Sequence, residues 1–240
     1  MFTWEKLGNV FDPDHYAETS RFRHFGQSPS ALVLEDRVRV YFCTRPPPDA
    51  DGQYKSYINH LDLDRNDLRS VLAIGNEPII ELGGFGTFDE FGTYPVSVIQ
   101  DGDETRAYYA GLTRCESVPF NAAIGLAVSK DGGETFERAG AGPVLCYTPD
   151  EPFLLGSPRI RKFGDRWHLF YVSGKRWLSE GARPEPVYKI RMASSSDGIE
   201  WIRHGRDLLS DRLGPDECQA CGDVTFRNGR YHMFYSYRRL

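Results

Sequence analysis

The sequence predicts an all-β fold, a five-bladed β-propeller built of four-stranded antiparallel blades. Three observations favour it: an internal repeat, turn signals between short apolar segments, and an aromatic content of 13%. The repeat recurs at intervals of about 64 residues, and 24 Gly and 15 Pro are spread along the 240 residues. Such frequent turn residues favour short strands over helices.

The first two strands of each repeat form a hairpin. The aligned second strands are RVRVYFCTR (37–45), ETRAYYAGL (104–112), RWHLFYVSG (166–174) and RYHMFYSYR (230–238), which share the aromatic column Tyr41, Tyr108, Phe170 and Phe234. Each follows a turn signal such as Asn228-Gly229 and a short apolar segment. Two apolar segments joined by a tight turn predict a β-hairpin.

A third and a fourth strand complete the repeat. The third strands YINHLDLD (57–64), AIGLAVSKD (123–131) and KIRMASSSD (189–197) carry Ile at matched positions. One four-stranded sheet cannot bury its apolar face alone, and sheets arranged radially about an axis solve this problem. A β-sandwich is the alternative architecture, but it gives no reason for the repeat.

The N-terminal segment is expected to close the ring. TWEKLG (3–8) resembles TFERAG (135–140) and EWIRHG (200–205), which predicts an outermost strand that completes the last blade. Residues 1–240 then form one propeller domain of about three and a half blades plus this closing strand, incomplete at its C-terminus. Five blades need about 320 residues, so we expect further C-terminal residues or a second chain to close the ring.

One conspicuous motif is interpreted as scaffold. SKDGGETF (129–136) has an echo in SSDGIEW (195–201), and it resembles the Asp-box of sialidases and related propellers. Ser129 and Asp131 can accept hydrogen bonds from turn amides, and the glycines permit positive φ. This turn joins the third and fourth strands, and so it lies on the face opposite the expected axial pocket.

Candidate functional residues come from the strand ends that face the pocket. They are His24, Arg45, Asp89, Glu90, Arg114, Glu151, Trp177, Glu217, Tyr237 and Arg238. Carboxylates can serve as acid and base, and an aromatic face can stack on a sugar ring. Glycoside hydrolysis generally needs two carboxyl groups, about 5–5.5 Å apart for retention or about 6.5–9.5 Å apart for inversion. The alternative is that these carboxylates pair with arginines in a structural network.

The segments TFDEFGTYP (87–95), WHLFYVSGKRW (167–177) and YHMFYSYR (231–238) resemble a known group. This group consists of uncharacterised bacterial five-bladed propeller proteins allied to the arabinanase, β-xylosidase and β-fructosidase-like glycosidases. The resemblance implies Asp89 or Glu90 as base or pKa modulator and Glu217 as general acid. It also implies an Asp at the start of the first blade, where this chain reads GQSPS (26–30).

We therefore expect a glycosidase-like protein that hydrolyses a glycosidic bond in an axial pocket by paired carboxylates. His24, Arg45, Arg114, Glu151, Trp177, Tyr237 and Arg238 would bind the carbohydrate. The alternatives are a non-catalytic carbohydrate-binding propeller serving polysaccharide assembly, a glycoside phosphorylase, and a scaffold whose rim binds protein. The last predicts a flat apolar face.

The amino-acid composition disfavours nucleic acid and membranes as partners. The net charge of −5 gives no basic footprint for nucleic acid, and no apolar run approaches the ~20 residues of a membrane span. The five cysteines and the absence of a secretory signal at the start favour a cytoplasmic protein with free thiols. We expect no cofactor and no metal.

Overall fold

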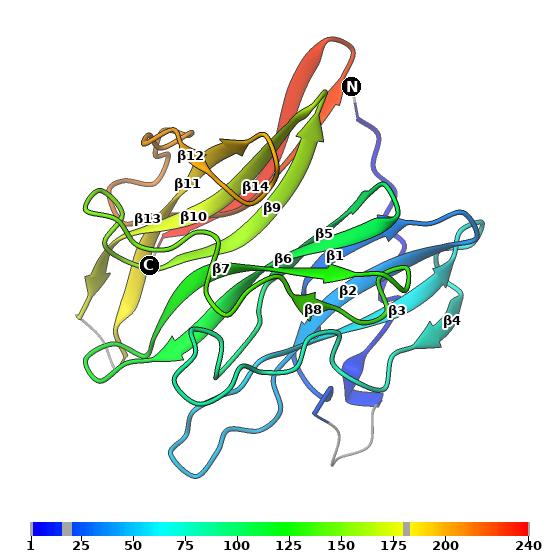
Figure 1. The fold of residues 1–240 in the computed structure, drawn as a ribbon, viewed down its shortest axis with the longest axis horizontal. Helices are drawn as coiled ribbons and strands as arrows, with labels where there is room; N and C mark the ends of the chain where they lie inside the picture. The colour runs from blue at the N-terminus through cyan, green and yellow to red at the C-terminus, as the bar shows by residue number, and fades with distance from the viewer. Residues whose placement is uncertain (1, 16–20, 180–182, 240) are drawn as a thin grey trace.

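The computed structural model describes residues 2–15, 21–179 and 183–239, and its strands form antiparallel sheets (Figure 1). The first sheet comprises β1 (Gln27–Val33), β2 (Arg37–Thr44), β3 (Tyr57–Asp64) and β4 (Val71–Ile74). The second sheet comprises β5 (Val96–Asp101), β6 (Glu104–Arg114), β7 (Phe120–Ser129) and β8 (Glu137–Arg138). The third sheet comprises β9 (Leu155–Phe163), β10 (Arg166–Leu178), β11 (Glu185–Ser195) and β12 (Ile202–Arg203). The fourth comprises β13 (Glu217–Arg227) and β14 (Arg230–Arg239), and η1 (Pro13–His15) is a helical turn.

The sheets are fanned about a common centre, as the repeat predicts. Within each sheet the strands pair in chain order, and the first strands β1, β5, β9 and β13 pack against one another in succession. The hairpin signals are confirmed. For example, Asn228 (φ 51°) and Gly229 (φ 72°) turn β13 into β14, as a two-residue hairpin loop requires.

The apolar core lies between neighbouring sheets. One buried cluster joins the first and second sheets through residues such as Tyr41, Ile58 and Val98. A second cluster joins the second and third sheets through residues such as Tyr108 and Leu169. Burial of one sheet's face by the next explains why the aromatic column repeats, because each blade needs a large side chain at the same contact.

The Asp-box turns are confirmed as scaffold. The Ser129 hydroxyl accepts the Gly133 amide at 2.8 Å, and the Asp131 carboxylate accepts the amides of Glu134 and Thr135 at 3.0 and 3.1 Å. The Tyr41 hydroxyl of the first sheet donates to the Gly133 carbonyl at 2.8 Å. The turn therefore fastens the second blade to the first.

The next blade repeats this contact. Ser195 and Asp197 accept turn amides in the same way, and the Tyr108 hydroxyl of the second sheet donates to the Gly198 carbonyl at 2.8 Å. The two tyrosines occupy the same column of the repeat. Each one joins its own sheet to the Asp-box turn of the following sheet.

Residues 3–8 join no described sheet, so the closing role of the N-terminal segment stays a prediction. An outermost strand pairs with the third strand of its blade, and the fourth described sheet holds only β13 and β14. The segment is instead held by side chains. Phe2 and Trp4 pack edge-on against Phe234, while Val10 and Phe11 pack on the first sheet. Within the described residues, no helix is both long and apolar enough to cross a bilayer.

The Tyr41 contact predicts that an alanine substitution destabilises the fold more at Gly133 than at the adjacent Gly132. An alanine Cβ at Gly133 (φ +86°) would lie 2.2 Å from the Tyr41 hydroxyl oxygen, whereas one at Gly132 (φ +76°) would meet nothing within 4 Å. Left-handed backbone costs a non-glycine residue about 1–2 kcal/mol, and overpacking adds about 1–3 kcal/mol. Chemical denaturation should show a larger loss of unfolding free energy for Gly133→Ala than for Gly132→Ala. Equal losses would contradict the contact.

Asp131 should make the fold sensitive to acid. Burial alone would raise the pKa of Asp131, but hydrogen bonds from Ser129 and Thr135 outweigh it and lower this pKa to about 2. Because the unfolded carboxyl titrates near 3.9, this stabilisation is present above about pH 4 and is lost as pH falls toward 2. Unfolding free energy measured from pH 5 to 2 should fall less steeply for Asp131→Asn than for the wild type. Asp103→Asn, in an exposed turn, should keep the wild-type slope.

Candidate functional site

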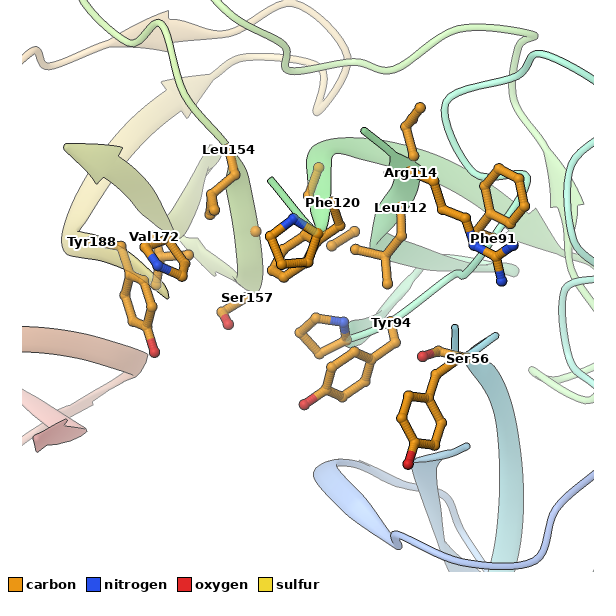
Figure 2. Close-up of a pocket in the computed structure, with 18 of the residues that line it drawn as sticks. Ser56, Phe91, Tyr94, Leu112, Arg114, Phe120, Leu154, Ser157, Val172 and Tyr188 are labelled. Carbon is orange, nitrogen blue, oxygen red and sulfur yellow. The ribbon is translucent and has the colours of Figure 1, made fainter. Parts of the chain in front are cut away.

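A pocket of about 460 Å³ opens where the first strands of the sheets begin (Figure 2). Its lining includes Arg45, Tyr54 and Ser56 of the first blade, Phe91, Tyr94, Leu112, Arg114 and Phe120 of the second, Leu154, Ser157, Val172 and Tyr188 of the third, and Arg238 of the fourth. Convergence of strand ends on one mouth confirms the position that the repeat predicts for the pocket.

Three of the first strands are irregular near their starts, and Ser157 of one such start lines the pocket. The ladders of β1, β9 and β13 each contain a register shift at their start, and in each a residue has positive φ: Ser28, Ser157 and Cys221. Bulges of this kind re-aim side chains. Tyr94 holds the corresponding place before β5, and its hydroxyl accepts a hydrogen bond from the Ser28 hydroxyl at 3.3 Å. Ser28 thus stands in GQSPS, where the resemblance implies an Asp.

Four arginines mark the ends of the second strands, and three of them are paired with carboxylates. Their partners are Asp49 for Arg114 (2.6 Å), Asp216 for Arg176 and Glu185 for Arg238 (2.9 Å). Arg114 and Arg238 line the pocket, and Arg114 also lies over the Phe91 ring, 4.2 Å from its centroid.

Arg45 differs from the other three arginines. It lies over the Tyr94 ring, 4.9 Å from its centroid, and it has no carboxylate within ion-pair distance among the described residues. Its Nε is buried without a hydrogen-bond partner, a feature that it shares with Arg114, so the missing carboxylate is what sets it apart. Burial raises the pKa of Tyr94, so this phenol stays neutral at physiological pH and can donate a hydrogen bond. Arg45 and Tyr94 therefore present a positive charge and a hydroxyl at the pocket.

Asp89, a predicted catalytic residue, does not line the pocket. Its side chain is 1% exposed and accepts hydrogen bonds from Tyr109 (2.9 Å), Arg138 (2.8 Å) and Thr87 (3.0 Å). Tyr109 lies on β6 and Arg138 on β8. The carboxylate therefore joins the loop before β5 to the second and fourth strands of its own blade.

Glu151, predicted to bind substrate, has an equivalent network in the third blade. It is 2% exposed and accepts hydrogen bonds from Tyr171 (3.0 Å), Arg191 (3.1 Å) and Arg203. Burial alone would raise the pKa of Glu151, but the hydrogen bond and charge of Arg203 lead the interactions that hold this pKa below its usual value. A carboxyl group held ionised in this way suits a structural ion pair.

The two networks are one motif repeated. In both, the tyrosine follows the carboxylate by 20 residues, and the arginine follows by 49 residues in one case and 52 in the other. These arginines and tyrosines are not among the candidate functional residues that the sequence predicts. The signal that could have found them is the equal spacing from Asp89 and Glu151 to the second tyrosine of AYYAG (107–111) and the tyrosine of LFYVSG (169–174).

Glu217, the predicted general acid, lies apart from the pocket lining. It is fully buried and accepts the Arg212 and Leu213 amides at 2.6 and 2.7 Å and the Gln219 side chain at 2.8 Å. Burial alone would raise the pKa of Glu217, but these hydrogen bonds lower it overall. A lowered pKa disfavours proton donation near neutral pH.

The remaining predicted residues also lie outside the pocket lining. Glu90 accepts the Gly86 amide, His24 pairs with Asp14 at 2.7 Å, and Tyr237 lies beside Arg212. Trp177 packs edge-on against Phe120, 5.7 Å between centroids, and so supports the pocket wall from behind. The structure thus brings together Arg45, Arg114 and Arg238 from the predicted set. Within the described residues, no group of three or more His, Cys, Asp or Glu side chains is arranged to hold a metal ion.

No protein-family model matches the chain. Rv1502 and MT1551, uncharacterised proteins of Mycobacterium tuberculosis strains ATCC 25618 / H37Rv and CDC 1551 / Oshkosh, are each 33% identical to it over 236 residues, which cover 98% of this chain and 76% of each relative. A β-1,2-mannobiose phosphorylase of Thermoanaerobacter sp. (strain X514) is 24% identical over 176 residues, 69% of this chain and 54% of the relative.

Solved structures of glycosidases share the fold. The α-L-arabinofuranosidase of Lactobacillus brevis superposes with a TM-score of 0.67 at 12% identity, covering 94% of this chain and 69% of that one. The Bombyx mori GH32 β-fructofuranosidase BmSUC1 superposes with a TM-score of 0.63 at 18% identity, covering 90% of this chain and 42% of that one. The Listeria innocua β-1,2-mannobiose phosphorylase in complex with β-1,2-mannobiose superposes with a TM-score of 0.60 at 15% identity, covering 86% of this chain and 66% of that one. The chain spans less than two thirds of the last two, and these likenesses show the fold alone.

The repeated network predicts a structural role for Glu151. Replacement by alanine leaves Arg191 and Arg203 without their shared carboxylate, and breaking a buried ion pair typically costs about 3–5 kcal/mol. Glu151→Ala should lower the unfolding free energy in this range, as measured by chemical denaturation. Asp150→Ala, at the exposed neighbouring position, should change it by about 0.5 kcal/mol or less. A wild-type stability for Glu151→Ala would refute the structural role.

Proposed function

The chain belongs to the family of the mycobacterial proteins Rv1502 and MT1551, and it shares its propeller fold with glycoside hydrolases and phosphorylases. We propose that its pocket binds a carbohydrate and a phosphate together, so that a glycosidic bond is cleaved or formed with phosphate as the partner of the sugar. The observation that carries this proposal is a pocket rich in arginine and poor in carboxylates.

The scarcity of carboxylates favours phosphate over water. Hydrolysis generally needs one carboxyl group as acid and a second as base or nucleophile. Among the described lining residues the carboxylate is Glu185, and it is paired with Arg238. Asp89 and Glu217 are occupied by their own networks. Phosphate supplies its own nucleophilic oxygen and therefore needs no base from the protein.

Arg45 is the residue proposed to hold the phosphate. A guanidinium binds phosphate oxygens through two parallel hydrogen bonds, and it is always charged. The other arginines at the ends of the second strands have carboxylate partners, and Arg45 has none among the described residues. Stacking on Tyr94 fixes the plane of the guanidinium and leaves its edge for a ligand.

The proposed step transfers a glycosyl group to phosphate. An oxygen of monobasic phosphate forms a bond to the anomeric carbon, and the bond from that carbon to the glycosidic oxygen breaks. The departing oxygen keeps the electron pair and takes the phosphate proton, through water or a sugar hydroxyl. The products are a sugar 1-phosphate and an alcohol, and the same pocket supports the reverse direction.

Two other functions remain distinguishable by experiment. Hydrolysis through Asp89, Glu90 and Glu217 requires that these carboxylates leave their present hydrogen bonds and reach the sugar. Carbohydrate binding without turnover is favoured by the structural occupation of the same carboxylates. The 24% identity to a β-1,2-mannobiose phosphorylase supports the phosphate-dependent proposal over both.

Arg45→Ala should weaken phosphate binding by about tenfold or more, since hydrogen bonds to charged groups contribute about 1.5–3 kcal/mol. Titration calorimetry with inorganic phosphate measures this affinity. Arg206→Ala, an exposed arginine outside the pocket, is the matched control and should leave it unchanged. Release of phosphate from a panel of sugar 1-phosphates with monosaccharide acceptors should fall in parallel for Arg45→Ala.

Each contrary outcome has a distinct meaning. Equal phosphate affinity in Arg45→Ala and the wild type would overturn the assignment of Arg45. Cleavage of aryl glycosides at the same rate with and without phosphate would establish hydrolysis. Saturable sugar binding with no turnover in either assay would establish a binding protein.

A further inference from the structure

One wall of the pocket carries almost no groups that can bond a sugar hydroxyl. It lies between the second and third sheets and consists of Leu112, Phe120, Ala122, Leu154 and Val172 (Figure 2). In Figure 2 the labelled members of this apolar wall lie along one side of the cavity, and Tyr94 and Ser56 lie at another. The pocket therefore has an apolar wall and a separate polar and cationic rim.

The apolar wall is part of the protein core. Ala122, Leu154 and Val172 are only 3–5% exposed and form one cluster, against which Leu112 and Phe120 pack. Leu112, Phe120 and Ala122 are paired along the ladder between β6 and β7, and Val172 along that between β9 and β10. The Leu154 carbonyl accepts the Gly174 amide at 2.8 Å. A wall of this kind cannot turn a polar side chain toward a ligand.

This wall discriminates between substituents on a sugar. A hydroxyl group pressed against it would lose water and gain no partner, which weakens binding by about 5- to 150-fold. A methyl group in the same place strengthens binding by about fourfold. The side-chain hydroxyls that the third blade contributes to the pocket lining are those of Ser157 and Tyr188, and Tyr188 packs against the cluster of the wall.

Space for such a substituent exists beside Gly156. This glycine lines the pocket, and a Cβ built on it would lie 3.7 Å from Val172 and 3.8 Å from Ala110, which are ordinary van der Waals contacts. Its φ is not in the left-handed region, so an alanine is tolerated there. The position offers a way to fill the apolar side of the pocket without disturbing the fold.

We propose that the pocket selects a sugar unit carrying a methyl group, either a 6-deoxyhexose or an O-methylated hexose, with the methyl group against the wall of Leu112, Phe120, Ala122, Leu154 and Val172. This inference rests on the proposed carbohydrate function and names its substrate class. It depends on the wall alone, whereas the phosphate proposal depends on Arg45.

The test compares sugars that differ only in the methyl group. Methyl α-L-rhamnoside against methyl α-L-mannoside, and L-fucose against L-galactose, test a 6-deoxy substituent, while O-methylated mannose and glucose derivatives against their parent sugars test an ether. Calorimetry in the presence of inorganic phosphate should show at least tenfold tighter binding of the methyl-bearing member in one arm. Saturation-transfer NMR should show the strongest transfer to its methyl protons.

Two variants connect the preference to the wall. Val172→Thr places a hydroxyl there at nearly constant volume and should reduce the methyl-to-hydroxyl affinity ratio at least threefold. Val33→Thr, the same change at a 63% exposed position on β1, should leave the ratio unchanged. Gly156→Ala should weaken the methyl-bearing sugar at least fivefold, and thermal melting verifies that each variant is folded.

The outcomes separate this inference from the proposed function. Equal or tighter binding of the hydroxylated members in every arm would overturn the methyl preference and leave the carbohydrate function standing. A preference that persists unchanged in both Val172→Thr and Gly156→Ala would overturn the assignment to this wall. Failure of every sugar to bind, with phosphate still bound through Arg45, would overturn the carbohydrate function and this inference with it.

Discussion

A tyrosine hydroxyl that crosses from one blade to the next sets the geometry on which the pocket depends. Tyr41 and Tyr108 each donate to a glycine carbonyl in the Asp-box turn of the following blade, both at 2.8 Å. Both rings are fully buried, so each hydroxyl must find a partner inside the protein. In both turns the accepting glycine has positive φ, 86° at Gly133 and 79° at Gly198, and the bond ties each sheet to its neighbour.

The same repetition gives two buried carboxylates equivalent surroundings. Asp89 and Glu151 occupy equivalent places in consecutive blades, each bound by a tyrosine of the second strand and an arginine of the fourth. This shared arrangement favours a role for both carboxylates within their own blades. The arginines at the ends of the second strands recur as well, and there the informative member is Arg45, because it lacks the carboxylate partner that the others have within the described chain.

The fold could be predicted from the sequence repeat because its features depend on local sequence patterns. The hairpins, the aromatic column and the Asp-box turns depend on residues close together in the chain, and all are present. The roles of Asp89 and Glu217 could not be inferred in this way. Whether a carboxylate faces the axis or turns into its blade is decided by Arg138, 49 residues away, or by the amides of Arg212 and Leu213, which no strand pattern marks.

Substitutions on the two sides of the pocket are expected to affect the stability of the fold to different degrees. Leu154, Val172 and Ala122 belong both to the wall and to the packing between the second and third sheets, so a polar side chain there would weaken the contact that positions the pocket. Arg45 stands at a strand end with its guanidinium over an aromatic ring, outside the buried clusters that join the sheets. A change of charge at the rim is therefore expected to affect the fold less than a polar side chain in the wall, whose apolar character is tied to the packing between sheets.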